Sequence, residues 1–174
     1  MKNIRKRAHT VPAVAVCLLV LGSAAAFAQK KFMILTPGRP EVKVLLAGAV
    51  ERDKGRISLE KAESVKSGEV MHWTITSMNE GNAPARDYRA VGIVPAGTEL
   101  VAGSVSADGS ATVSYSIDNG KSFSAQPTVD EKQPDGSTRK VAAPISMYTQ
   151  IRYEWADPLT QGIKLNAFYK VRLK

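Results

Sequence analysis

The chain has few of the side chains on which most catalytic and metal sites depend. Its 174 residues include one cysteine and two histidines, and Cys17 lies in an N-terminal apolar segment. A zinc site recruits several His or Cys ligands, and a Ser-His-Asp hydrolase needs a histidine beside its nucleophile. Beyond the apolar segment the sequence contains only His72 and no G-x-S-x-G motif. We therefore expect no catalytic, metal or cofactor residues, regard a hydrolase as the weakest hypothesis, and interpret His72 as structural.

The composition is otherwise that of a folded domain. Hydrophobic residues make up 44% of the chain and charged residues 23%, which excludes a collagen-like or disordered chain. One domain typically takes roughly 100–200 residues. The length of 174 residues therefore favours a single domain.

The first 28 residues have the three parts of a secretory signal peptide. Met1–Thr10 contains four basic residues and no acid, Val11–Ala26 is apolar apart from Ser23, and Ala26-Phe27-Ala28 is a small-x-small site. We predict a signal peptide over residues 1–28, cleavage after Ala28, and a periplasmic or secreted protein. A retained membrane anchor is the alternative, but the apolar run is short for a span of about 20 residues.

Removal of this leader changes the meaning of the formal charge of +8. Four of the 24 basic residues and none of the 16 acidic residues lie in the leader, so Gln29–Lys174 carries +4. Half of the net positive charge therefore lies in the predicted export signal. Because the remaining charge is small and the chain is expected to be exported, nucleic acid is not an expected partner. No later apolar run is long enough to span a bilayer, so we expect no transmembrane segment in the mature chain.

Apolar and polar residues alternate along most of Gln29–Lys174, and no stretch has a convincing helical period. Short alternating strands separated by Gly, Pro and Asn turns are typical of a β-sandwich. We therefore predict an entry segment over residues 29–40 and one all-β, immunoglobulin-like, antiparallel β-sandwich over residues 41–174, with Gln126–Lys140 as a loop. The expected strands are Val42–Val50, Glu69–Met78, Tyr88–Val94, Glu99–Val105, Ala111–Ile117, Lys121–Ser124, Gln150–Trp155 and Lys164–Lys174.

The order of turns and core residues from Val65 onward resembles a known repeat. The motifs are Val65-Lys66-Ser67-Gly68-Glu69, Trp73-Thr74-Ile75-Thr76, Asn79-Glu80-Gly81, Ala83-Pro84-Ala85, Val94-Pro95-Ala96-Gly97, Leu100-Val101, Tyr148-Thr149-Gln150-Ile151-Arg152-Tyr153, Asp157-Pro158-Leu159, Gly162 and Tyr169-Lys170-Val171-Arg172-Leu173. Over roughly Ile57 to Lys174 the chain is similar to the immunoglobulin-like repeat of bacterial surface and exported proteins, the domain of unknown function eleven. Gly92 stands where that family usually has Asp. The resemblance implies a structural or adhesive module and assigns no catalytic residues.

Several acidic motifs favour a structural interpretation. The stretch Ser116–Phe123 resembles the Asp-box hairpin of sialidases, in which the Asp caps a turn and the aromatic packs beneath it. A sialidase needs a propeller of several blades, for which this chain is too short, so we predict a rigid hairpin.

The carboxylate pairs are more typical of solvated surface than of the facing acids of a glycosidase, and no EF-hand spacing is present. These acids are Glu60 with Glu63, Asp130 with Glu131, and the isolated Asp118 and Asp135.

The last predicted strand carries the one feature that suggests a binding site. Four basic residues and a phenylalanine share one face of it, which we call the basic strip. A cationic strip with an aromatic side chain suits an anionic glycan or a lipid head group. The competing explanation, which we favour, is an edge strand whose lysines prevent pairing with another chain. The basic strip consists of Lys164, Phe168, Lys170, Arg172 and Lys174.

These observations predict a non-enzymatic structural or interaction module of the bacterial envelope. Strand addition at a sheet edge needs only unpaired backbone groups, so such a module leaves little trace in the sequence. We expect an envelope or surface protein as its partner, bound through loops or a sheet edge. The alternative is binding of anionic envelope polysaccharide or lipid head groups through the basic strip.

Overall fold

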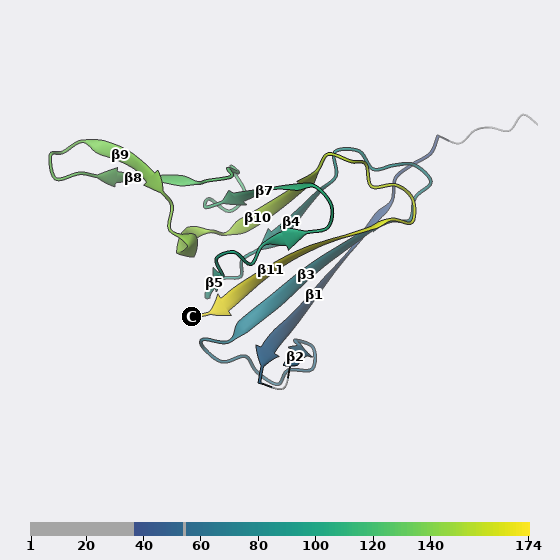
Figure 1. The fold of residues 1–174 in the computed structure, drawn as a ribbon, viewed down its shortest axis with the longest axis horizontal. Helices are drawn as coiled ribbons and strands as arrows, with labels where there is room; N and C mark the ends of the chain where they lie inside the picture. The colour runs from purple at the N-terminus through teal and green to yellow at the C-terminus, as the bar shows by residue number, and fades with distance from the viewer. Residues whose placement is uncertain (1–36, 54) are drawn as a thin grey trace, which may run out of the picture. The chain divides into compact units, whose positions relative to one another are not determined.

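The computed structural model describes residues 37–53 and 55–174 (Figure 1). The predicted signal peptide and residues 29–36 of the predicted entry segment lie outside the described residues. No helix among the described residues is long and apolar enough to cross a membrane. The strands are β1 (Val42–Arg52), β2 (Gly55–Ser58), β3 (Val70–Asn79), β4 (Arg89–Ile93), β5 (Thr98–Leu100), β6 (Ser106–Ala107), β7 (Ala111–Ser116), β8 (Thr128–Lys132), β9 (Thr138–Ala142), β10 (Gln150–Trp155) and β11 (Lys164–Leu173), with a 3₁₀ turn η1 (Ile145–Met147).

Nine of the eleven strands form two packed antiparallel sheets, and β8 and β9 form a separate hairpin, so the prediction of an all-β sandwich is confirmed. The first sheet has the order β2-β1-β3-β11-β5, and β6 also pairs with β11. The second sheet has the order β4-β10-β7. The chain crosses from the first sheet to the second between β3 and β4 and again between β6 and β7. It returns to the first sheet between β4 and β5 and again between β10 and β11.

Period-two alternation places one face of each central strand in the core. On β11 the inward residues are Ala167, Tyr169 and Val171, and each is at most 2% exposed. They face Tyr153 and Ile151 of β10 within one hydrophobic cluster. The strands that the sequence predicted most clearly are therefore the ones that build the core.

Two tyrosines tie the sheets together through their hydroxyl groups. Tyr153 of the second sheet donates a hydrogen bond to the carbonyl oxygen of Phe168 in β11 (2.9 Å). Tyr169 of the first sheet donates in the opposite direction to the carbonyl oxygen of Ile93 in β4 (2.8 Å). Burial raises the pKa of Tyr169 to about 12, so its hydroxyl remains a neutral donor at physiological pH.

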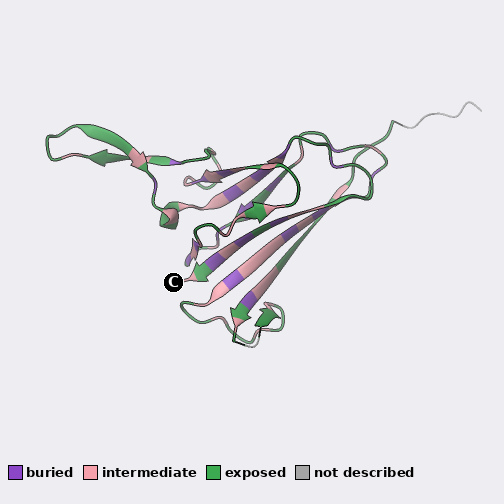
Figure 2. Ribbon diagram, in the orientation of Figure 1, coloured by how far each residue is buried: buried purple, intermediate pink, exposed green. Residues whose placement is uncertain are grey.

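The prediction of a loop over Gln126–Lys140 is wrong. This stretch contains the β8–β9 hairpin, in which Asp130 lies opposite Lys140 and Glu131 opposite Arg139. Most of its residues are exposed, as Figure 2 shows. A ribbon that buries neither face needs no apolar alternation, so its strands carried no period-two hydrophobic signal.

The stretch Glu99–Val105, predicted as one strand, is also different in the structure. Only Thr98–Leu100 forms β5, and a turn closed by the Ser104 N–H to Val101 O hydrogen bond (3.2 Å) follows it. The strand Lys121–Ser124 is reduced to a single bridge between Tyr115 and Ser124. The first segment therefore adds only a short strand beside β11, and the second adds no strand to its sheet.

Strand β11 is not an edge strand, which overturns the explanation that we favoured for the basic strip. One side of β11 pairs with β3 over nine residues, from Lys164 opposite Met78 to Arg172 opposite Val70. Its other side pairs with β5 and β6. Because its edges are occupied along most of its length, its lysines are not needed to prevent pairing there.

Candidate functional site

The basic strip lies on the outer face of the first sheet. Its side chains alternate with the buried Ala167 and Tyr169, so they point away from the core. Lys164, Phe168, Arg172 and Lys174 are exposed, and Lys170 is half-buried.

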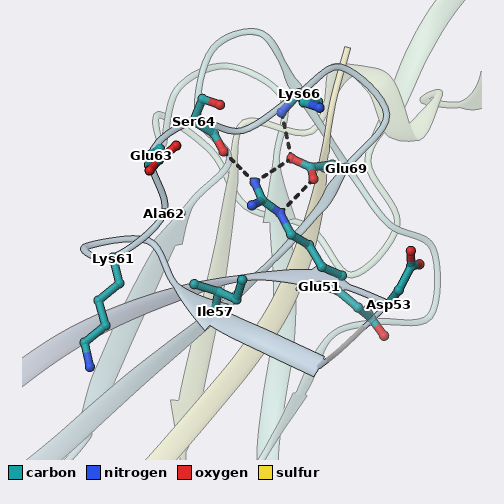
Figure 3. A pocket seen from close by; sticks show the side chains of 10 residues that line it. Glu51, Asp53, Ile57, Lys61, Ala62, Glu63, Ser64, Lys66 and Glu69 are labelled. Carbon is teal, nitrogen blue, oxygen red and sulfur yellow. Dashed lines mark hydrogen bonds and ion pairs between the residues drawn. The ribbon is translucent and has the colours of Figure 1, made fainter.

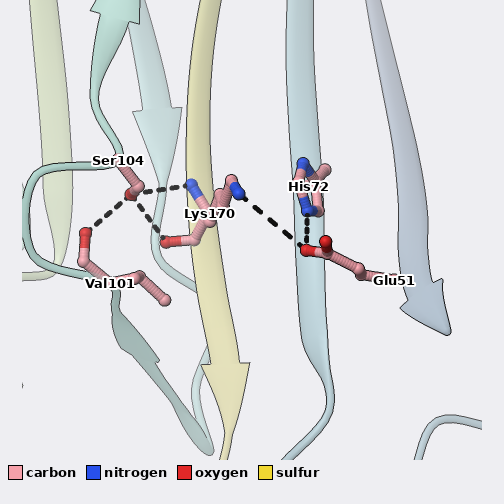
Figure 4. A network of polar contacts seen from close by, with 5 residues as sticks. All are labelled: Glu51, His72, Val101, Ser104 and Lys170. Carbon is pink, nitrogen blue, oxygen red and sulfur yellow. Dashed lines mark hydrogen bonds and ion pairs between the residues drawn. The ribbon is translucent and has the colours of Figure 1, made fainter. Parts of the chain in front are cut away.

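Lys170 belongs to a polar network that spans β1, β3 and β11 (Figure 4). Its Nζ lies 3.8 Å from Oε2 of Glu51, and the same oxygen lies 2.6 Å from Nε2 of His72. The hydrogen bond with His72, followed by the charges of His72 and Lys170, holds the pKa of Glu51 below its usual range. His72 therefore supports a network on the sheet surface, and Lys170 is partly neutralised by Glu51.

A shallow cleft of about 210 Å³ lies over this part of the sheet. An exposed aromatic ring, cationic groups and hydroxyl groups line it. Lys164, Arg172 and Lys174 are not among its lining residues. The lining residues are Arg56, His72, Trp73, Thr74, Ser104, Ser106, Phe168, Tyr169 and Lys170.

A larger cavity of about 620 Å³ lies at the end of β1 and β2 (Figure 3). Its central charges already satisfy one another, because Arg52 bonds Oε1 of Glu69 (3.0 Å) and the carbonyl oxygen of Ser64 (2.6 Å). The backbone N–H of Lys66, followed by Arg52, lowers the pKa of Glu69. Glu63 also lines the cavity. No group of three or more His, Cys, Asp or Glu side chains within residues 37–53 and 55–174 is arranged to hold a metal ion.

The Asp-box stretch forms a compact turn around Asp118. Its carboxylate accepts hydrogen bonds from the hydroxyl of Ser116 (2.6 Å) and from the N–H and hydroxyl of Ser122 (2.9 and 2.6 Å). These bonds, led by that of Ser116, hold the pKa of Asp118 well below its usual range. The ring of Phe123 stacks on the guanidinium of Arg152 at 4.3 Å. The carboxylate is committed to the turn, as a structural role requires.

The strongest surface feature is an apolar side of the sandwich that the sequence analysis did not identify. Val44, Leu45 and Leu46 of β1 are 58%, 66% and 54% exposed. On β4, an edge strand of the second sheet, Val91 and Ile93 are 45% and 61% exposed. Exposed apolar side chains on edge strands form the kind of surface to which another chain can pair.

The second sheet leaves the inner face of β1 uncovered. Val44 and Leu46 share a face with Val50, which is fully buried at the other end of β1. Leu46 of the first sheet and Val91 of β4 both line a small cavity of about 140 Å³. The first sheet therefore extends beyond the second on this side.

The chain covers other edges of the sandwich with its own segments. The bridge from Ser124 covers β7, and β5 and β6 cover β11. Strand β2 covers only the end of β1, beginning where the N–H of Leu59 donates to the carbonyl oxygen of Gly48 (2.9 Å). Among the described residues no strand pairs with the outer edge of Val42–Ala47, which we call the open edge.

No family model matches the chain, and comparison with curated proteins and with solved structures finds no similar protein. The resemblance to the immunoglobulin-like repeat therefore stays a prediction.

Proposed function

We propose that the chain is a non-enzymatic interaction module of the bacterial envelope, which binds an envelope or surface protein at the open edge. Export through the leader over residues 1–28 would place it in the periplasm or release it. The partner adds a strand to β1 of the first sheet. The observation that carries this proposal is the exposure of Val44, Leu45 and Leu46 along an unpaired edge.

Strand addition suits this edge for two physical reasons. Unpaired N–H and C=O groups of an edge strand supply affinity without any special side chain. Each fully buried Val or Leu side chain adds about 1.5–3 kcal/mol through the hydrophobic effect. Both contributions come from groups that a monomer leaves in water.

The double substitution Val44→Lys and Leu46→Lys tests this proposal. Both side chains are more than half exposed, so lysine is tolerated by the fold, but a docked strand would have to bury its charge. We expect capture of the partner from an envelope extract to fall by at least about tenfold. Ile163→Lys, at a residue that is 50% exposed outside the strands, is the matched control and should not reduce capture. Equal capture by the wild type and the double variant would contradict the proposal.

Binding of anionic envelope polysaccharide or lipid head groups is a second candidate function. Phe168 is exposed on the same face as Lys164, Arg172 and Lys174, which favours this function. Among the described residues, none of these three basic side chains forms an ion pair. Replacement of these three basic residues by Gln should abolish salt-sensitive retention on envelope glycans or anionic vesicles, because screening weakens exposed charge pairs. The triple variant Lys121→Gln, Lys132→Gln and Lys140→Gln makes the same change of charge elsewhere. Retention lost equally in both variants would show an effect of net charge alone.

A further inference from the structure

The open edge has a defined length and direction. The carbonyl oxygen of Gly48 points away from β3, because it accepts from Leu59. Alternation along an antiparallel strand then points the N–H and C=O groups of Val42, Val44 and Leu46 the same way. Beyond Gly48 the edge is occupied by the chain itself. The open edge therefore offers three residues whose backbone groups all face outward.

We propose that a second copy of this chain occupies the open edge, with the two β1 strands antiparallel about a two-fold axis at Val44. This inference rests on the proposed function, because it names the partner of the same edge. A two-fold contact uses the same patch on both copies, so a self-complementary edge is its requirement.

The register follows from the two limits of the open edge. With Val44 opposite its own copy, Val42 lies opposite Leu46, and Lys43 opposite Leu45. A shift by two residues toward the C-terminal end would bring Val42 against Gly48, where Leu59 already lies. The Val44 register forms about six hydrogen bonds between the copies, two for each outward-facing pair. A typical interface has roughly ten, within a range that includes six.

The charge of the open edge permits self-pairing. Lys43 is its one charged residue, and its ammonium group pairs with Glu80 of the same copy. In the proposed register Lys43 faces Leu45, so no like charges lie directly opposite each other, an arrangement that would be destabilising.

The open edge also lacks the devices that keep edge strands apart. Monomeric proteins place free lysines, prolines or bulges on such strands. Val42–Ala47 contains no proline, and β1 pairs with β3 over nine consecutive residues without a bulge. Its lysine is held by Glu80. An apolar edge without proline or a bulge is a template for pairing with another strand of the same kind.

Disulfide trapping tests the register, because Cys17 is the sole cysteine of the sequence. In the Cys17→Ala background we expect Val44→Cys to form a covalent dimer under mild oxidation. Cα atoms of a hydrogen-bonded antiparallel pair are about 5.5 Å apart, within the range of about 4.4–6.8 Å for disulfides. Leu45→Cys is the control: Leu45 is more exposed than Val44, yet two copies of residue 45 would lie diagonally across the pair, about 7–8 Å apart.

Light scattering on the purified protein tests the dimer itself. We expect a dimer whose measured mass halves in Val44→Lys, because that substitution brings two ammonium groups together at the axis. Ile163→Lys, at a residue that is 50% exposed outside the strands, should leave the mass unchanged.

Three results would overturn the proposal. The wild type could be a monomer, residue 45 could cross-link as readily as residue 44, or the dimer could persist in Val44→Lys. If the wild type is monomeric but still captures an envelope protein through the open edge, the second copy is wrong and the proposed function stands. A monomeric wild type that also captures no envelope protein through the open edge would reject both the second copy and the proposed function.

Discussion

Replacement of Asn79 by Ala should lower the free energy of unfolding by about 4 kcal/mol, roughly 1 kcal/mol for each of its four hydrogen bonds. The side chain is fully buried at the end of β3. Its Oδ1 accepts from the N–H groups of Glu41 and Gly81 (both 3.0 Å), and its Nδ2 donates to the carbonyl oxygens of Ala83 (2.7 Å) and Leu159 (2.8 Å). One side chain therefore joins three separate segments of the chain.

Urea unfolding followed by tryptophan fluorescence measures this loss. The matched control is Asn82→Ala, because Asn82 is exposed and its Oδ1 accepts a single hydrogen bond, from the N–H of Arg39 (2.8 Å). We expect the control to cost at most about 1 kcal/mol. Equal midpoints for the two variants would show that the buried hydrogen bonds of Asn79 are not a main source of stability.

Tyr169→Ala should lower the free energy of unfolding by about 3–5 kcal/mol because it leaves a cavity in the core. Gly92→Ala should lower it by about 1–3 kcal/mol because its added Cβ overpacks the same contact. The ring of Tyr169 crosses the core against Gly92 of β4, where an added Cβ would lie 2.7 Å from Cε1 of the ring. The ring is 2% exposed and its hydroxyl is anchored on Ile93, so it has little freedom to move aside. The glycine makes room for the tyrosine.

A double-mutant cycle separates this contact from a general loss of strand propensity. If the clash with the ring causes the cost, Gly92→Ala should be nearly neutral in the Tyr169→Ala background, because the space is then open. The coupling free energy should be at least about 1 kcal/mol. Additive costs in the double variant would mean that the ring does not require the glycine.

Parts of this fold depend on local signals that are visible in the sequence. In β3, β10 and β11 apolar side chains alternate with polar ones, and burial of one face maintains that pattern. The motif Asn79-Glu80-Gly81 does end β3, but its glycine has no positive φ. Gly81 is needed because a Cβ would collide with the backbone of Arg39 and Glu41.

The sequence by itself determined the all-β class, the core strands and the shortage of catalytic groups, because each follows from residue types and a period of two. It did not predict the β8–β9 hairpin, because that ribbon lies in water on both faces. The tertiary structure decided which edges are covered. Val44 and Leu46 have the apolar pattern of core residues, and only the narrower second sheet leaves them exposed. Exposure depends on the width of the opposite layer, which alternation within one strand does not encode.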